Sequence, residues 1–342
     1  MGEAELPRRY QSHAVGADGC LRLLQLTDLH IMDIERAFAG TTVPEEWRQE
    51  VGDSRTCLRL TLQLITDIIH SQQPHVAVLT GDIVDTRSAS TLQEFLDAFR
   101  PLAETLDSLG VPWLYIPGNH EEGHGEDFAR TDLVELLQLP GSLLQKGCVQ
   151  NFDQTHVLQI APSLATGTGS LLLQLVDAKW TKNTCFITQE QVKTARRALA
   201  EASADCGAYI GARLAFVHEP FDAFANTDLP LVSGVCSYAP RQRMEDSGYL
   251  DLLCSMGFHG LFVGHNHHND FVRWQGGNGD LWFGHGRCGS YFPPSSWEGR
   301  LPLPFARGAR LFEVNLGLST LATWIVEEGS GVLESSRLAR RL

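Results

Sequence analysis

Positive charge is scarce in this chain of 342 residues, which has 27 Lys and Arg against 41 Asp and Glu and a formal net charge of -14. A chain this acidic has little electrostatic attraction for nucleic acid or for an anionic membrane. We therefore expect neither nucleic acid nor a membrane as its partner. An anionic substrate would need a local source of positive charge.

Several other features are lacking. No apolar run approaches the ~20 residues of a membrane-spanning helix, and the N-terminal stretch MGEAELPRRY lacks the apolar core of a signal peptide. The eight cysteines include no close pair, which excludes a zinc finger or a CxxC redox site. Because several cysteines lie in apolar or helical runs, we expect reduced thiols and a cytoplasmic protein.

Two common catalytic patterns are also missing. The chain contains no GxSxG after a strand, which argues against a serine hydrolase. The stretch from Thr166 to Ser170 lacks the lysine of a P-loop and precedes a strand instead of a helix.

Short apolar runs alternate with longer amphipathic segments in the first half of the chain. This rhythm predicts parallel strands with helical crossovers, and consecutive strands follow in the second half. We expect one α/β domain over residues 1–342, with a core of about 20–315 and a C-terminal extension of 316–342. The predicted strands are 21–27, 76–80, 111–116, 157–160, 171–176, 214–217, 261–263, 271–274, 281–283 and 309–314. The predicted helices are 57–70, 91–109 and 132–139, with a further one from Thr188, where Gln191 completes a capping box. Residues 33–53 and 233–248 are predicted loops.

Five of these strands end in polar residues of similar chemistry. The strand ends carry Asp28 and His30, Asp82 and Asp85, Asn119 and His120, His218, and finally His265 and His267. In open α/β sheets, ligands bind at the carboxyl ends of strands. The sequence therefore predicts that these side chains converge at one edge.

Each motif taken alone has an ordinary structural explanation. Asp28 to His30 can be a turn, residues 264–268 can be a solvated turn, and Gly118 can serve a turn with positive φ. Their occurrence together, each directly after a strand, favours a shared site. A buried cluster of His and Asp side chains would also be costly without a compensating charge.

Metal ions would supply that charge. Imidazole and carboxylate ligands suit Mn²⁺, Fe²⁺/³⁺ and Zn²⁺. The candidate ligands are too many for one ion, so we expect two: Asp28, His30, Asp82, Asn119, His218, His265 and His267. Two divalent cations and two ionised carboxylates leave about +2 at the site, which can attract a phosphate.

The series DxH, GDxxD, GNHE, VxH and GHxH resembles the calcineurin-like metallophosphoesterase superfamily over about residues 20–315. Within it, the strand end from Gln25 to Asp28, the stretch from His268 to Asp270 and the block from Gly286 to Gly289 resemble the atypical plant purple acid phosphatases and related fungal signalling phosphatases. The resemblance implies a four-layer α/β/β/α sandwich of the metallophosphatase type.

The resemblance also implies individual roles. Asp28, His30 and His267 would hold the first metal and Asn119, His218 and His265 the second, with Asp82 bridging both. A metal-bridging water would attack phosphorus, and His120 would protonate the leaving oxygen. Asn119 and Arg287 are the expected substrate contacts, and the alternative for Arg287 is a structural salt bridge.

One departure from the purple acid phosphatases matters. Those enzymes have GDxxY, with a tyrosine on ferric iron, where this chain has Asp85, and they have DxG where it has His30. A colourless protein is therefore expected. Asp85 and Asp270 can orient ligand imidazoles or be solvated loop acids, whereas Glu121 is expected to shape its loop.

The sequence thus predicts a dinuclear phosphomonoesterase acting on a phosphorylated small molecule or phosphoprotein. A phosphodiesterase or pyrophosphatase on the same site remains an alternative. A non-catalytic scaffold would be expected to have lost metal ligands, and none of the predicted ligands is missing from this chain.

Overall fold

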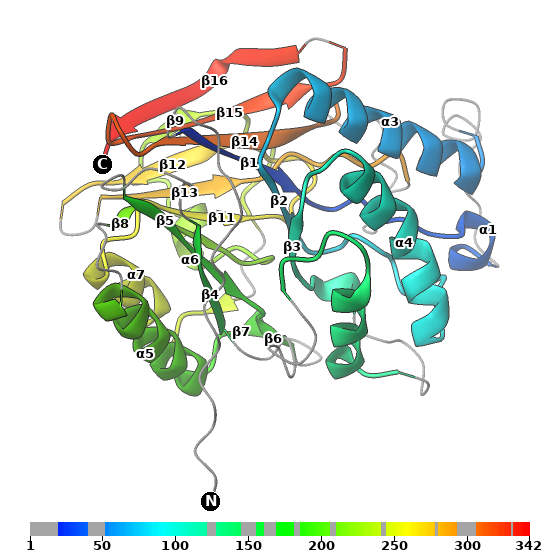
Figure 1. Ribbon diagram of the computed structural model, residues 1–342, viewed down its shortest axis with the longest axis horizontal. Helices are drawn as coiled ribbons and strands as arrows, with labels where there is room; N and C mark the ends of the chain where they lie inside the picture. The colour runs from blue at the N-terminus through cyan, green and yellow to red at the C-terminus, as the bar shows by residue number, and fades with distance from the viewer. Residues whose placement is uncertain are drawn as a thin grey trace, which may run out of the picture.

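Two β-sheets pack face to face between helices in this computed structural model (Figure 1). The structure describes residues 20–39, 52–121, 128–144, 155–160, 169–180, 185–205, 210–240, 244–277, 280–292, 306–329 and 331–342.

The first sheet has six strands, in the order β16 (Gly331–Arg341), β15 (Thr320–Glu327), β14 (Gly308–Asn315), β1 (Cys20–Leu26), β2 (Val76–Thr80) and β3 (Trp113–Ile116). The strands β1, β2 and β3 are parallel to one another, and β14 pairs antiparallel with β1. The strands β15 and β16 continue the sheet, each antiparallel to the strand before it. Helix α3 (Ser54–Gln72) connects β1 to β2, and α4 (Leu92–Ser108) connects β2 to β3. The crossovers predicted for the first half are confirmed.

The second sheet has seven strands, in the order β4 (Thr155–Ile160), β5 (Ser170–Val176), β8 (Ile210–Phe216), β11 (Gly260–Val263), β13 (Leu281–His285), β12 (Val272–Gln275) and β9 (Leu231–Ser233). Its central strands β5, β8, β11 and β13 are parallel. A small third sheet contains β10 (Met244–Glu245), β7 (Cys185–Phe186) and β6 (Lys179–Trp180).

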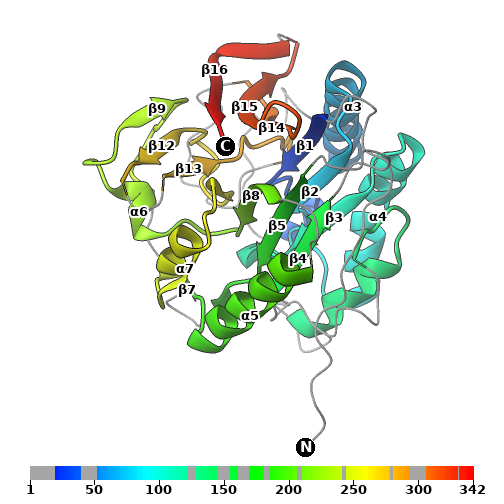
Figure 2. The same cartoon turned by 60° about the vertical axis from the view of Figure 1, so that its left-hand side comes forward.

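Helices cover the outer face of each sheet. Figures 1 and 2 show α3 and α4 on one side of the molecule and α5 (Gln189–Asp205) with α7 (Tyr249–Ser255) on the other. Between the sheets, Phe312 of β14 packs edge-on against Phe216 of β8 and Phe262 of β11. The other helices among the described residues are α1 (Ile34–Ala37), α6 (Asp222–Ala225) and the 3-10 helices η1 (Asn119–Glu121) and η2 (Arg130–Gln138). The predicted four-layer sandwich is confirmed.

Most predicted elements lie where the sequence places them. The cap of α5 is confirmed, because Gln191 N donates to Thr188 Oγ1 at 3.1 Å and Thr188 N donates to Gln191 Oε1 at 2.9 Å. The segment predicted as a helix at 132–139 is the 3-10 helix η2. Residues 316–342, expected to be an extension, contain β15 and β16 of the first sheet.

Some predictions reach beyond the described residues. Residues 40–51 of the expected loop 33–53 and residues 166–168 of the phosphate-loop-like stretch lie outside them, as do Cys148 and Cys206. No disulfide joins two of the six described cysteines. Among the described segments, no helix has the length and apolar character needed to cross a membrane.

Candidate metal centre

Polar side chains from both sheets meet at the carboxyl ends of the parallel strands. The first sheet supplies Asp28 and His30 after β1, Asp82 after β2, and Asn119 and His120 after β3. The second sheet supplies His218 after β8, and His265 and His267 after β11. The structure therefore brings together the seven side chains predicted as metal ligands.

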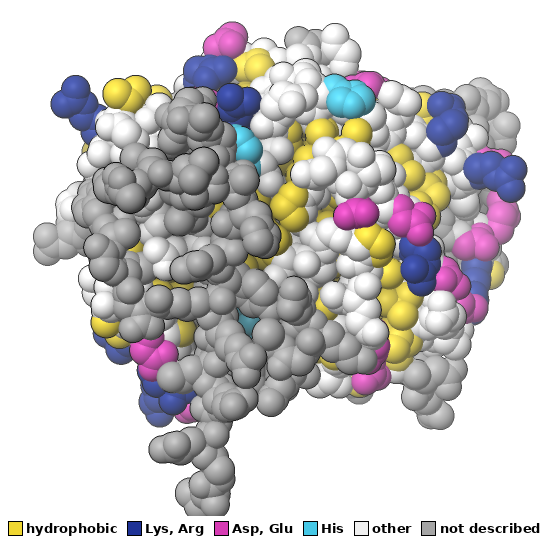
Figure 3. All heavy atoms as spheres, viewed as in Figure 1, with side chains coloured by type: hydrophobic (Ala, Val, Ile, Leu, Met, Phe, Trp, Pro, Cys, Tyr) yellow, Lys and Arg dark blue, Asp and Glu magenta, His cyan; other side chains and the backbone are white. Residues whose placement is uncertain are grey.

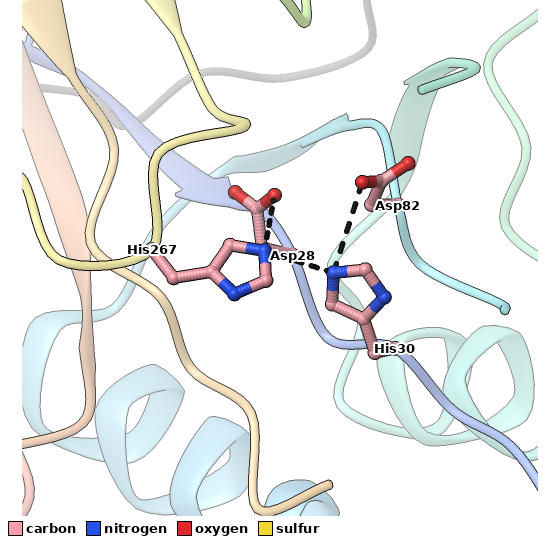
Figure 4. A group of neighbouring side chains, drawn as sticks. All are labelled: Asp28, His30, Asp82 and His267. Carbon is pink, nitrogen blue, oxygen red and sulfur yellow. Dashed lines mark hydrogen bonds and ion pairs between the residues drawn. The ribbon is translucent and has the colours of Figure 1, made fainter. Parts of the chain in front are cut away.

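The first group of donors contains Asp28, His30, Asp82 and His267, and all four are buried (Figure 4). The Nε2 atoms of His30 and His267 lie 3.0 Å apart. His267 Nε2 is 3.3 Å from Asp28 Oδ1, and His30 Nε2 is 3.7 Å from Asp82 Oδ2. Figure 4 shows the four side chains pointing toward one another.

The second group of donors contains Asp82, Asn119, His218 and His265. Asn119 Oδ1 lies 3.2 Å from His218 Nε2 and 2.8 Å from His265 Nδ1, while His218 Nε2 lies 3.2 Å from Asp82 Oδ2. Asp82 Oδ2 therefore faces histidine nitrogens of both groups.

Hydrogen bonds on the far side of the imidazoles leave lone pairs facing inward. His218 Nδ1 lies 2.8 Å from the carbonyl oxygen of Thr80. A carbonyl can only accept, so Nδ1 donates, and in the neutral ring Nε2 presents a lone pair to Asn119 Oδ1 and Asp82 Oδ2. Three acceptors in contact require either a proton or a cation between them. The residues present therefore fit a metal ion at this position.

In the first group, the carboxylate of Asp85 lies behind the ring of His30, and it also lies next to the ring of His120. Its Oδ2 lies 3.2 Å from His30 Nδ1 and 3.2 Å from His120 Nδ1. Arg87 donates to both oxygens of the same carboxylate, at 2.9 and 2.7 Å. Asp85 is thus placed to orient a candidate ligand and the candidate acid, as metal ligands are usually oriented by a carboxylate behind them.

Backbone strain is concentrated in these residues. Six described non-glycine residues have positive φ, and four of them are Asp28, His30, Asp82 and His265, with φ of 55°, 47°, 51° and 68°. Positive φ is uncommon for such residues and clusters at functional sites. The surrounding structure therefore holds these side chains in place against their local preference.

Glu121 supplies much of that support. Its buried carboxylate accepts from the backbone N–H groups of Asp82, Ile83, Val84 and Gly118, at 3.0, 2.8, 3.1 and 2.7 Å. Burial and the charge of Asp82 raise the pKa of Glu121 to about 7, against the effect of these donors. Glu121 thus shapes the loops after β2 and β3, as predicted from the sequence.

The charged groups of the cluster act strongly on one another's pKa. Burial opposes the charged forms, yet His218 and His120 hold the pKa of Asp82 well below its usual range. In turn, Asp82 raises the pKa of His218 well above its usual value despite burial. Burial lowers the pKa of His265 to about 3. These shifts describe the protein without cations, in which protons on histidine balance the carboxylates.

His120 lies at the accessible side of the cluster. Its side chain is 19% exposed, whereas those of Asp82 and Asp85 are buried. Although burial lowers the pKa of His120, Asp82 and Asp85 raise it above the ordinary value. The position and the protonation state both suit a proton donor to a bound substrate.

Arg287 forms the structural salt bridge and not the substrate contact. It is 1% exposed and forms ion pairs with Asp270 and Glu327. It also donates to the carbonyl oxygen of Ala306 at 2.9 Å. This is the structural salt bridge that the sequence left open, and no described contact of Arg287 supports a role in substrate binding.

Two residues close to the site were not identified from the sequence. Arg87 contacts Asp85, and Arg130 donates to the carbonyl oxygens of Pro117 and Gly118, just before Asn119. Neither arginine belongs to a strand-end motif. The only local signal was the position of Arg87 two residues after Asp85.

Comparisons with known proteins agree with this geometry. A family model described as calcineurin-like phosphoesterase matches residues 21–269. A dimetal phosphatase from Danio rerio superimposes with a TM-score of 0.56 at 12% identity, over 93% of this chain and 98% of that one. The anchor protein GAP50 of the Plasmodium inner membrane complex gives a TM-score of 0.51 at 12% identity, over 94% and 88% of the two chains. No curated protein matches the sequence.

Proposed function

This chain belongs to the calcineurin-like phosphoesterase family, and on that premise we propose that it is a dinuclear metal-dependent phosphoesterase that hydrolyses phosphate monoesters. The observation that carries the proposal is the arrangement of the atoms that could bind a metal. Two groups of nitrogen and oxygen atoms point their lone pairs inward, and both groups include the carboxylate of Asp82. Without cations, protons on histidine would have to separate these lone pairs.

Each group of donors would hold one cation. Asp28, His30 and His267 would bind the first, Asn119, His218 and His265 the second, and Asp82 would contact both. When bound, two divalent ions such as Mn, Fe or Zn supply a water of lowered pKa and stabilise charge on the phosphoryl group.

The protein itself contributes the leaving-group proton. His120 is the partly exposed imidazole beside Asn119, and Asp85 lies behind its Nδ1. A carboxylate in this place holds the ring with Nε2 directed away from Asp85, toward a leaving oxygen. We infer that His120 is the general acid and that Asp85 orients it.

The substrate is proposed to be a phosphorylated small molecule or phosphoprotein. Figure 3 shows acidic and basic side chains interspersed on the described part of one face, over the region of α3 and α4. Together with the net charge of -14, this supports phosphate capture by the metal centre itself and no role for nucleic acid or membrane. No disulfide joins two of the six described cysteines, which supports a cytoplasmic location.

A panel of substrates and variants tests the proposal. Hydrolysis of 4-nitrophenyl phosphate is measured with and without added Mn²⁺ for the wild type, His120→Ala and Asp82→Asn. The control is His70→Ala, which changes an exposed histidine of α3. We expect Mn²⁺-dependent hydrolysis that falls by about 10²–10⁴-fold in His120→Ala, the usual range for loss of a general acid.

Two outcomes would contradict the proposal. Faster hydrolysis of bis(4-nitrophenyl) phosphate than of the monoester would favour a phosphodiesterase on the same site. Absence of metal binding and of hydrolysis would favour a scaffold, because the fold also occurs in an anchor protein.

A further inference from the structure

A largely buried arginine joins the two sheets beside the candidate metal centre. Arg130 donates from Nε to Asp177 Oδ2 at 3.1 Å and from Nη2 to Asp177 Oδ1 at 2.5 Å. The same guanidinium donates from Nη1 to the carbonyl oxygen of Gly118 at 2.8 Å and from Nη2 to that of Pro117 at 3.2 Å. The side chains of Arg130 and Asp177 are 14% and 1% exposed.

The partners of Arg130 come from different sheets. Pro117 and Gly118 follow β3 of the first sheet and directly precede Asn119. Asp177 follows β5 of the second sheet, and its carbonyl oxygen accepts from Gln191 Nε2 at 2.6 Å, at the start of α5. Arg130 therefore ties the loop after β3 to a position fixed by the second sheet and its helix.

That loop has to be placed accurately relative to the second sheet. The second group of donors combines Asn119 from the first sheet with His218 and His265 from the second. A metal site tolerates deviations of about 0.2 Å in ligand distance. Movement of the loop relative to the second sheet would therefore weaken this group more than the first group, to which Asn119 does not belong.

We propose that Arg130 and Asp177 are positioning residues, which fix Asn119 and His120 relative to His218 and His265. A buried ion pair contributes little net stability because desolvation offsets its attraction. Its geometry is nevertheless specific, since the planar guanidinium bonds to a carboxylate and two carbonyl oxygens at once, as a lysine cannot. Burial lowers the pKa of Arg130, whereas the charges of Asp177 and of Glu219, next to His218, raise it.

The test measures metal binding directly, because this inference rests on the proposed metal centre. Calorimetric titration with Mn²⁺ is performed on the wild type, Arg130→Lys and Asp177→Asn. The matched control is Arg22→Lys, since Arg22 also pairs with a carboxylate, that of Glu313, and donates to a carbonyl oxygen, that of Gln72. Arg22 lies on β1, whose carboxyl end carries the site.

We expect Arg130→Lys to weaken one of two Mn²⁺ sites by about 10–100-fold, the usual effect of losing a residue that supports a ligand. Asp177→Asn should act on the same site more weakly, since one acceptor oxygen remains, and Arg22→Lys should bind like the wild type. In an Asn119→Ala background, Arg130→Lys should have little further effect on Mn²⁺ affinity, because the ligand that it positions is already absent.

The possible failures can be told apart. If the wild type binds two Mn²⁺ and Arg130→Lys only lowers the melting temperature, or weakens both sites equally, the positioning role is refuted and the proposed function stands. Additive effects of Arg130→Lys and Asn119→Ala would also refute it. If the wild type binds no Mn²⁺, the proposed function fails as well.

Discussion

The substitution Gly118→Ala gives the sharpest test of the close packing around Asp82. A Cβ at residue 118 would lie 2.3 Å from Asp82 Oδ1, 2.5 Å from Asp82 N and 2.8 Å from His218 Cε1. Gly118 does not have positive φ, so its backbone conformation does not require glycine. Glycine is required there because a Cβ would collide with Asp82 and His218. The substitution therefore tests packing alone.

The structure also indicates how large the effect should be. The backbone N of Asp82 cannot move freely, because it donates to Glu121, so the strain falls on the side chains of Asp82 and His218. Overpacking of a rigid interior costs about 1–3 kcal/mol. Asp82 faces both groups of donors, and we expect both Mn²⁺ affinities to fall at least tenfold, or about 1.4 kcal/mol each.

Two measurements check this prediction. Urea denaturation of the metal-free protein gives the loss of unfolding free energy, and calorimetric titration with Mn²⁺ gives the affinities. Gly317→Ala is the matched control, because a Cβ there meets only Asn315 Oδ1, at 3.6 Å, and its φ is not positive. Wild-type stability and Mn²⁺ affinity in Gly118→Ala would refute the packing described here.

Three further predictions follow from individual side chains. Asp85→Asn should lower kcat/KM for 4-nitrophenyl phosphate by about 10–100-fold, because His30 and His120 lose the charge behind them. The control is Asp97→Asn, an exposed change on α4. Equal kcat/KM in Asp85→Asn and the wild type would contradict the role of Asp85. Burial lowers the pKa of His156 on β4 from 6.5 to about 4, so the unfolded chain takes up the proton first as the pH falls. Relative to His156→Gln, the wild type should lose about 1.4 kcal/mol of unfolding free energy per pH unit as the pH falls from 6.5 to 4. Denaturation curves of both proteins at pH 7.5 and 5.0 measure the difference. The same change of unfolding free energy with pH in both proteins would count against this prediction. Because Asp85 replaces the tyrosine of the purple acid phosphatases, the iron-loaded protein should show no tyrosinate-to-iron band in its visible spectrum, and a purple protein would contradict this.

The sequence predicted the parallel strands well because each is short, apolar and bounded by polar residues. The strand predicted at 76–80 coincides with β2, and that at 281–283 lies within β13. The C-terminal strand β16 was missed because it lacks this apolar pattern. It lies at the sheet edge, has partly exposed residues along its length and contains several charged side chains, so its pattern resembles an exposed extension.

The candidate ligands were predictable because a parallel sheet collects strand ends at one edge. The residues that support them were not. Arg130 and Asp177 are separated by 47 residues, and their contact depends on how the two sheets pack. For Arg287 the sequence left two interpretations open, phosphate binding and a structural salt bridge, and only the packing of the fold places it beside Asp270 and Glu327.

The strained backbone indicates that the geometry of the candidate ligands is established before a cation binds. Positive φ at a non-glycine residue costs on the order of 1–3 kcal/mol, and Asp28, Asp82 and His265 all have it. Hydrogen bonds that involve no cation support these conformations: the backbone N–H of Asp82 donates to Glu121, and that of His265 donates to both oxygens of Asp28 at 3.0 Å. The fold therefore positions the donors before a cation binds, so that binding energy is not spent on ordering them. Removal of the metal should accordingly leave the backbone of these loops in place, and amide hydrogen exchange that rises throughout them in the metal-free protein would show that the cations create the geometry instead.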